Sequence, residues 1–269
     1  MGKIYRDVVT AGTTKFVKIG VTHETTPGAK RRPREKSTSK AVAAGNERNA
    51  KRNLQMILNN NFLPDDWHLI LSYGGAEPTT KQARKDLDDF KRRMARAYKA
   101  KGKNLKWVVT TEFKDGRIHH HMVCSAGVSM EEILTIWRHG HVLHRALSKS
   151  GDYRELAAYM IKETSQTFRE PDAPCRRRYC CSRSIERPVA DREEGISAAT
   201  FLKGPEPDPG YFIDPGSVFN ARNELTGRGY LQYVMIKLNS GFLKGAMCAE
   251  QRIKISEKQV DCLLQCSMF

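Results

Sequence analysis

The chain has 269 residues, enough for one or two domains with substantial cores. Lysine and arginine number 46 against 30 acidic residues, and the resulting net charge of +16 favours a polyanionic partner, of which nucleic acid is the foremost. No apolar run approaches the roughly 20 residues of a membrane-spanning helix. The first residues also lack the apolar core of a signal peptide. The sequence therefore predicts a cytosolic protein with no membrane association.

Residues 1–40 form a basic N-terminal segment with a short predicted strand over 15–21. Residues 30–37 have no apolar side chain and are typical of a solvated arm. A helix is predicted over 39–59, where Leu54, Ile57 and Leu58 form an apolar stripe. Basic side chains lie off this stripe and are either ordinary surface charges or phosphate contacts: Arg48, Lys51 and Arg52.

The middle of the chain alternates strand-like and helix-like segments. A buried strand is predicted over 67–73, strands over 106–113 and 117–124, and helices over 79–101, 129–137 and 153–164. Thr79 with Gln82, and Ser129 with Glu132, have the spacing of capping boxes at two helix starts. Two adjacent strands with a short turn between them favour an α+β domain over 41–170, with a central antiparallel sheet and helices packed on one face.

Residues 171–269 form a partly basic C-terminal extension, which we expect to pack on the preceding domain. It contains several prolines and a predicted strand over 229–238. The chain has no GxxxxGK[ST] motif, so no P-loop ATPase is expected. Its seven cysteines are expected to be reduced thiols, with a zinc site at Cys175 and Cys180 as the alternative.

Three consecutive histidines at 119–121 interrupt a strand-like run. Alternate side chains of a strand share a face, so His119 and His121 are predicted to point together and His120 away. If the turn at 114–116 closes a hairpin, Glu112 returns to this pair as a third ligand. Two imidazoles and a carboxylate suit non-haem iron, zinc, Mg²⁺ or Mn²⁺, and the sequence chooses among them only through context, since the net charge of +16 favours phosphodiester chemistry over an oxygenase.

A second candidate is the helix that carries Tyr159 and Lys162. Residues three apart share a helix face, and a neighbouring positive charge favours the ionised phenol. Such a tyrosine is a plausible covalent nucleophile towards a phosphodiester, although the spacing is also common in ordinary packing. Tyr153 lies six residues away on another side of an ideal helix, so one catalytic tyrosine is favoured. His139 and His141 flank Gly140 and are interpreted as part of a turn.

Glu112 with the histidine triplet, followed by Tyr159-Met160-Ile161-Lys162, resembles the HUH endonucleases, and most closely the rolling-circle replication initiators of bacterial plasmids, phages and integrative elements. The similarity extends over about residues 40–190 and includes the segments 46–54, 61–62, 137–140 and 181–185 with Pro188. The sequence departs from the family pattern at His120, where the family has a bulky apolar residue.

The resemblance implies a set of roles. His119, His121 and Glu112 would bind Mg²⁺ or Mn²⁺, which polarises the scissile phosphate of DNA. Tyr159 would attack phosphorus and remain attached as a 5′-phosphotyrosine, and Lys162 would position the phosphate. The substrate would be single-stranded or hairpin origin DNA in the bacterial cytosol, with a host helicase and polymerase as partners. Basic residues expected to contact DNA are Arg48, Lys51, Arg52, Arg117, Arg176, Arg177 and Arg178.

Two other functions stay open from the sequence. One is a relaxase or single-strand transposase of a mobile element, which shares the chemistry. The other is a catalytically silent DNA-binding regulator.

Overall fold

The computed structural model describes residues 3–22, 40–113, 116–165, 167–197, 199, 204–222 and 227–238. The predicted basic arm at 30–37 lies outside these residues. The chain forms two compact units, one over residues 44–187 and one that combines residues 1–43 with 188–269. The sequence predicts that the central domain ends at residue 170. In the structure this unit continues to Arg187, because residues 180–181 pair with one of its strands.

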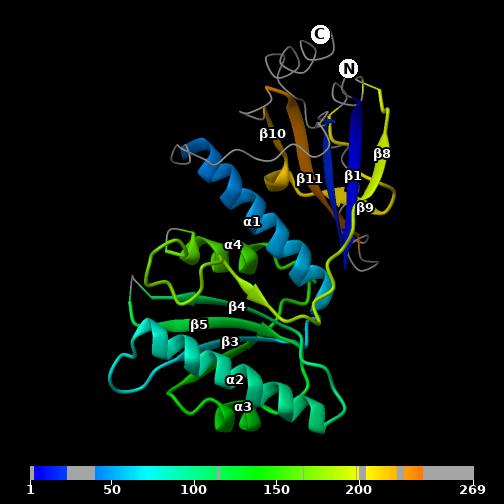
Figure 1. Cartoon of the computed structure of the whole chain (residues 1–269). Coiled ribbons are helices and arrows are strands. Elements are labelled where there is room, and N and C mark those ends of the chain that lie inside the picture. Colours follow the sequence, from blue (N-terminus) through cyan, green and yellow to red (C-terminus); the bar gives the residue numbers. More distant parts are fainter. Residues whose placement is uncertain are drawn as a thin grey trace, which may run out of the picture. The chain divides into compact units, whose positions relative to one another are not determined.

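The unit over 44–187 is built on an antiparallel sheet (Figure 1). Its described strands run in the order β6-β3-β5-β4-β7, and they are β3 (Trp67–Ser72), β4 (Trp107–Glu112), β5 (His119–Cys124), β6 (Val142–Ala146) and β7 (Cys180–Cys181). The structure confirms the predicted strands β3, β4 and β5. The edge strands β6 and β7 were not predicted, because one is largely exposed and the other has two residues.

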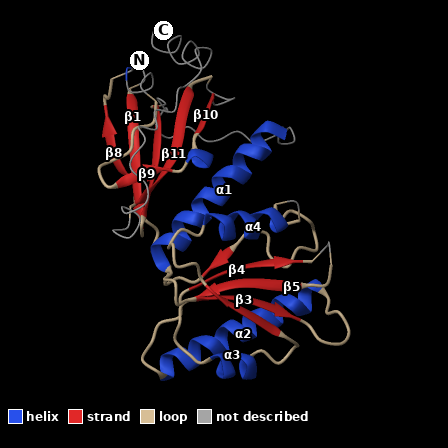
Figure 2. Ribbon diagram, turned by 180° about the vertical axis from the view of Figure 1, so that it is seen from behind, coloured by secondary structure: helices blue, strands red, loops and turns tan. Residues whose placement is uncertain are grey.

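Helices cover both faces of this sheet (Figure 2). On one face α2 (Thr80–Ala100) and α3 (Met130–Ile136) pack against Val109 and Met122. On the other, α1 (Lys40–Asn61) and α4 (Arg154–Thr164) pack against Val108 and Val123. The prediction of helices on one face was therefore wrong. Neighbouring strand positions are both apolar, so each face of the sheet has a surface to bury.

The helix starts follow the local signals in the sequence. At α3, Ser129 Oγ accepts a hydrogen bond from Glu132 N at 3.2 Å, and Ser129 N donates to Glu132 Oε2 at 2.8 Å. This is the complete capping box that the spacing predicts. At α2, Thr79 accepts from Gln82 N, but the Gln82 amide donates to Asp86 instead of returning to the cap. Only half of the second predicted box is therefore present.

The start of α4 is fixed by polar contacts from α1. Asp152 accepts hydrogen bonds from Gln55 Nε2 at 2.7 Å and from Asn59 Nδ2 at 3.0 Å. Tyr153 N donates to Asn59 Oδ1 at 2.9 Å, and the buried Tyr153 hydroxyl lies 3.4 Å from the carbonyl oxygen of Phe62. Tyr153 thus belongs to the packing between α1 and α4. These contacts set the position of α4 on the sheet.

The other unit contains an antiparallel sheet made from both ends of the chain. The described strands are ordered β10-β11-β2-β1-β8, with β9 also on β11, and they are β1 (Ile4–Ala11), β2 (Thr14–Val21), β8 (Asp191–Glu194), β9 (Tyr211–Ile213), β10 (Phe219–Arg222) and β11 (Gly229–Lys237). A 3₁₀ turn, η1 (Pro215–Ser217), precedes β10. Strands β2 and β11 were predicted, but no local signal shows that they pair.

The two antiparallel sheets and four helices of the described residues confirm the α+β class. Within the described parts of the chain, every helix is too short or too polar to span a membrane.

A close approach of two backbone segments gives a test of this architecture. A Cβ atom on Gly140 would overlap backbone atoms of Ser72, Tyr73 and Gly74 at the end of β3, whereas a Cβ on the facing Gly74 would lie 3.6 Å from Gly140 Cα. We expect Gly140→Ala to lower the free energy of unfolding by about 1–3 kcal/mol, because the backbone must move. Gly74→Ala is the matched control and should change it by less than about 0.5 kcal/mol.

Urea titration followed by tryptophan fluorescence measures this difference. All three tryptophans, Trp67, Trp107 and Trp137, lie in the unit over 44–187, so the signal reports on that unit alone. Equal stability of the two variants would contradict the close approach.

Candidate metal centre

The register between β4 and β5 brings the three predicted metal ligands together. Glu112 is opposite His119, and Thr110 is opposite His121. Because alternate residues of a strand share a face, His119 and His121 point to the same side of the sheet as Glu112. The hairpin that the sequence predicts is thus present.

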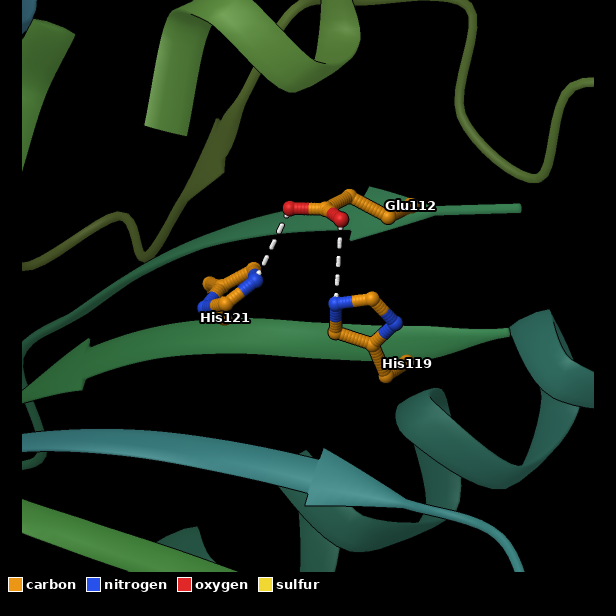
Figure 3. A group of neighbouring side chains, drawn as sticks. All are labelled: Glu112, His119 and His121. Atoms are coloured by element: carbon orange, nitrogen blue, oxygen red, sulfur yellow. Dashed lines mark ion pairs between the residues drawn. The ribbon is translucent and has the colours of Figure 1, made fainter. Parts of the chain in front are cut away.

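The three side chains converge on one point (Figure 3). Glu112 Oε2 lies 3.0 Å from His119 Nε2, and Glu112 Oε1 lies 2.9 Å from His121 Nε2. One potential ligand atom from each residue lies within 4.8 Å of the other two. The described residues contain one group of three or more His, Cys, Asp or Glu side chains spaced closely enough to hold a metal ion, and it is this one.

The electrostatics of the group suit a cation. Burial alone raises the pKa of Glu112, but the contacts with His119 and His121 outweigh it and lower the pKa to about 2. The carboxylate is therefore ionised at neutral pH. Its Oε1 atom is buried and forms an ion-pair contact with His121 Nε2 at 2.9 Å but no hydrogen bond. A buried carboxylate oxygen without a hydrogen bond is costly, and a cation between the carboxylate and the imidazoles would compensate it. The residues present therefore fit a divalent metal.

Hydrogen bonds behind the histidines hold their rings in place. His119 Nδ1 lies 2.8 Å from the carbonyl oxygen of Arg117. A carbonyl only accepts, so Nδ1 of His119 carries a proton, and Nε2, on the side of Glu112, is the nitrogen that would bind a metal. Such contacts behind a metal ligand fix its tautomer and orientation.

His68 on β3 contacts the ring of His121 on the side away from Glu112. No pattern in the sequence singles out His68. Its Nε2 lies 3.3 Å from His121 Nδ1, and the two rings are stacked with centroids 5.5 Å apart. Burial, together with the charges of His121 and Arg145, lowers the pKa of His68 to about 4. A neutral His68 accepts the Nδ1 proton of His121, so His121 Nε2 is the nitrogen that would bind a metal. Only the pairing of β3 with β5 reveals this contact.

Tyr159 lies beside this group. Its hydroxyl is 3.4 Å from His121 Nε2, the two rings meet edge to face with centroids 5.0 Å apart, and the residue is 43% exposed. Lys162 is exposed one turn further along α4. The structure therefore places the predicted tyrosine within contact distance of a predicted metal ligand, on a surface that a large substrate can reach.

His120 points to the opposite face, as strand alternation predicts. It is fully buried, its Nδ1 is 2.8 Å from Thr111 Oγ1, and its Nε2 is 3.1 Å from the Tyr73 hydroxyl. Burial lowers the pKa of His120 to about 3, so the ring is neutral. A neutral, hydrogen-bonded imidazole can replace the apolar residue expected here.

His139 and His141 lie before β6, apart from the cluster, with His139 Nε2 3.7 Å from Asp86.

The basic residues predicted to contact DNA differ in their surroundings. Arg117, Arg176 and Arg177 are exposed. Lys51 forms an ion pair with Glu47 at 2.6 Å, and burial lowers the pKa of Arg52 to about 10. The guanidinium of Arg178 lies over the ring of Phe168 at 5.0 Å. Arg48 is partly buried on α1.

The alternative zinc site has two of the ligands it needs. Cys175 Sγ and Cys180 Sγ lie 2.6 Å apart, and both residues are unbridged. The described residues bring no third His, Cys, Asp or Glu ligand to this pair.

Comparison with known proteins gives a family match that overlaps this site. Residues 66–167 match the model of the family described as Replication-associated protein ORF2/G2P. The matched segment begins just before β3, ends just after α4, and contains the metal cluster and Tyr159. No curated protein and no solved structure matches the chain. The resemblance to replication-associated proteins is thus confirmed over this segment, and the match is consistent with a replication initiator.

Removal of the ligands tests the centre directly. We expect Glu112→Gln, His119→Ala and His121→Ala each to weaken Mn²⁺ binding at least about tenfold, because each removes one donor atom of the set. The measurement is isothermal titration calorimetry on the full chain. His141→Ala removes an exposed imidazole outside the cluster and should bind Mn²⁺ like the parent protein. Unchanged binding by His121→Ala would refute the centre.

His68 can be tested by its hydrogen bond. His68→Phe keeps a ring but removes the acceptor, and we expect about 10- to 100-fold weaker Mn²⁺ binding. His68→Gln retains an acceptor at a similar reach and should recover most of the affinity. Calorimetry should be accompanied by thermal melting, since a defect in packing would lower stability. Equal affinities of the two variants would show that the contact between His68 and His121 has no part in metal binding.

Proposed function

We propose that the chain is a metal-dependent, site-specific DNA endonuclease and strand transferase that initiates rolling-circle replication. In this proposal it cuts one strand, keeps the 5′ end as a phosphotyrosine, and leaves a free 3′-hydroxyl as a primer. The observation that carries the proposal is the 3.4 Å distance between the Tyr159 hydroxyl and His121 Nε2, beside a cluster that fits a cation.

The chemistry follows from what these side chains can do. A divalent cation such as Mg²⁺ or Mn²⁺, when bound, supplies positive charge that polarises the phosphate. Tyr159 provides the nucleophilic oxygen, which forms a bond to phosphorus while the bond to the 3′-oxygen breaks. Lys162, one turn along α4, would hold the phosphate by its charge. The phosphotyrosine conserves the energy of the broken ester, so the strand can be rejoined without a nucleotide cofactor.

The environment of the site supports a nucleic-acid substrate. The net charge of +16 attracts a polyanion, and exposed arginines lie on the same unit as the cluster. Tyr159 is open to solvent, as attack on a DNA strand requires. Single-stranded or hairpin origin DNA is the proposed substrate. A host polymerase would extend the primer. A host helicase would unwind the duplex, because the sequence has no P-loop motif of its own.

Tyr159→Phe tests the proposed nucleophile. Removing the hydroxyl should abolish the covalent protein–DNA adduct, because no other group can form the phosphotyrosine, while DNA affinity should stay within about threefold. The measurement is an SDS gel of full-length protein incubated with Mn²⁺ and a labelled oligonucleotide from the DNA that flanks its coding region. Tyr153→Phe is the matched control and should still form the adduct. An adduct that persists in Tyr159→Phe would overturn the assignment.

The same experiment separates the rival functions. A DNA-binding regulator would shift the oligonucleotide in a native gel but leave no SDS-resistant band with the parent protein. A relaxase or transposase would form the same adduct, and would differ in the DNA sequence at which it forms.

A further inference from the structure

A cavity of about 650 Å³ opens at the outer edge of β4. Strand β7 pairs with Val108 and Val109, and within the described residues no strand covers the rest of that edge. The walls come from α2, from the second half of β4, and from the segment that follows α4. The volume lies within the range of cavities that hold small organic ligands.

The cavity is positively charged. Four basic side chains line it: Arg84, Lys91, Arg176 and Arg177. Asp88 is the one carboxylate among the lining residues, and it forms an ion pair with Lys91 at 2.7 Å. The three arginines therefore meet no further acid within the cavity wall. The basic surface also continues along α2, where Lys81, Lys85 and Arg92 adjoin Arg84 and Lys91. A ligand of this cavity should be an anion.

Thr110 provides an independent sign of a ligand. It lines the cavity and is 3% exposed, yet its hydroxyl has no hydrogen-bond partner. Buried hydroxyls are nearly always paired, so an unpaired one on a residue of the cavity wall suggests that a ligand supplies the partner. Thr110 also lies opposite His121 in the sheet and two residues before Glu112. The cavity thus adjoins the strand that carries a metal ligand.

The segment that carries Arg176 and Arg177 is hydrogen-bonded to α4, the helix that carries Tyr159. The Thr164 hydroxyl, at the end of α4, donates to the carbonyl oxygen of Arg178 at 2.9 Å. Arg176 and Arg177 immediately precede this contact. The position of α4 therefore sets both the nucleophile and the charged wall of the cavity.

We propose that this cavity binds one nucleotide of the DNA strand that crosses the metal centre. Arg176 and Arg177 hold its phosphate, and Thr110 donates a hydrogen bond to one of its acceptor atoms. The inference rests on the proposed function for its choice of DNA, since a free nucleotide offers the same phosphate. The strand would then be held at two points, at the scissile phosphate and at this flanking nucleotide, which is what fixes the distance from the cut to the recognised position.

The charges are tested by binding of fluorescein-labelled dT20 to the full chain, measured by anisotropy over a range of salt concentrations. Arg176→Gln with Arg177→Gln should weaken binding at least tenfold. The slope of log K against log salt should fall by about 1.4, that is, about 0.7 for each lost contact to single-stranded DNA. Arg93→Gln with Arg96→Gln removes the same charge from exposed positions of α2 outside the cavity, and should change affinity less than twofold. Equal losses in the two pairs would overturn the inference.

Thr110→Val tests the hydroxyl without a change of charge. We expect binding of dT20 to weaken three- to tenfold while the melting temperature stays constant or rises, because the variant removes an unpaired buried hydroxyl. A lower melting temperature with unchanged binding would show a structural role and contradict the proposal.

Cys175 lines the cavity and reports its occupancy. The hydrogen bond from Cys180 lowers the pKa of Cys175, so this thiol should react with iodoacetamide more readily than an ordinary cysteine. Site-resolved mass spectrometry should show that dT20 protects Cys175 and that dTMP protects it only at much higher concentration. Protection by dTMP without protection by dT20 would assign the cavity to a free nucleotide and overturn the DNA assignment.

These outcomes are separable from those of the proposed function. If the parent protein forms no adduct but the arginine pair and Thr110 variants lose affinity, the cavity stands as a DNA site and the nicking activity fails. If the adduct forms and the same variants bind like the parent, the cavity inference fails alone.

Discussion

The register between β4 and β5 is the constraint on which the candidate metal centre depends. Side chains alternate between the faces of a sheet, so a slip of one residue would send His119 and His121 into the core and bring His120 to the site. The opposite face prevents that slip. There His120 is held by Thr111 and Tyr73, between residues packed against α2. A third histidine outside the candidate metal group therefore helps to orient the two within it.

The second requirement is the position of α4, because Tyr159 reaches the centre only from that helix. Polar side chains of α1 bind the residues just before α4, through Asp152 and the main chain of Tyr153. Apolar residues of both helices then share a core with Val108 and Val123. Each strand of the centre thus has one face on the α2 core and the other on the α1 and α4 core. Tyr159 and the candidate ligands meet because both cores form on the same pair of strands.

Local patterns in the sequence were enough for the strands and helices of the central unit and for the alternation of the histidines. Glu112 could be proposed as a ligand because a short turn separates its strand from the strand of the histidines. The register of β4 on β5 places Glu112 opposite His119, as that turn predicts. What escaped prediction depends on contacts between distant segments. His68 meets His121 only through the pairing of β3 with β5, and β2 meets β11 from the other end of the chain. The second helix layer was missed because apolar pairs such as Val108 and Val109 were not recognised as two opposed surfaces. Strands as short as β7 or as exposed as β6 carry too little periodicity to be found.

The unpaired buried atoms of the central unit are concentrated where a ligand is proposed. Within its described residues the buried side-chain atoms without a hydrogen bond are Thr110 Oγ1, Glu112 Oε1 and Arg178 Nη1. Two of them lie on the same face of β4, and the third follows the arginines of the cavity wall. Elsewhere in this unit buried polar groups such as Asp66, Asn59 and His120 are paired. Unsatisfied groups lower stability, and the two on β4 lie where the proposed cation and nucleotide would supply the missing partners. The imidazoles of His119 and His121 keep the half-buried Glu112 carboxylate ionised, and the proposed cation would add to that stabilisation.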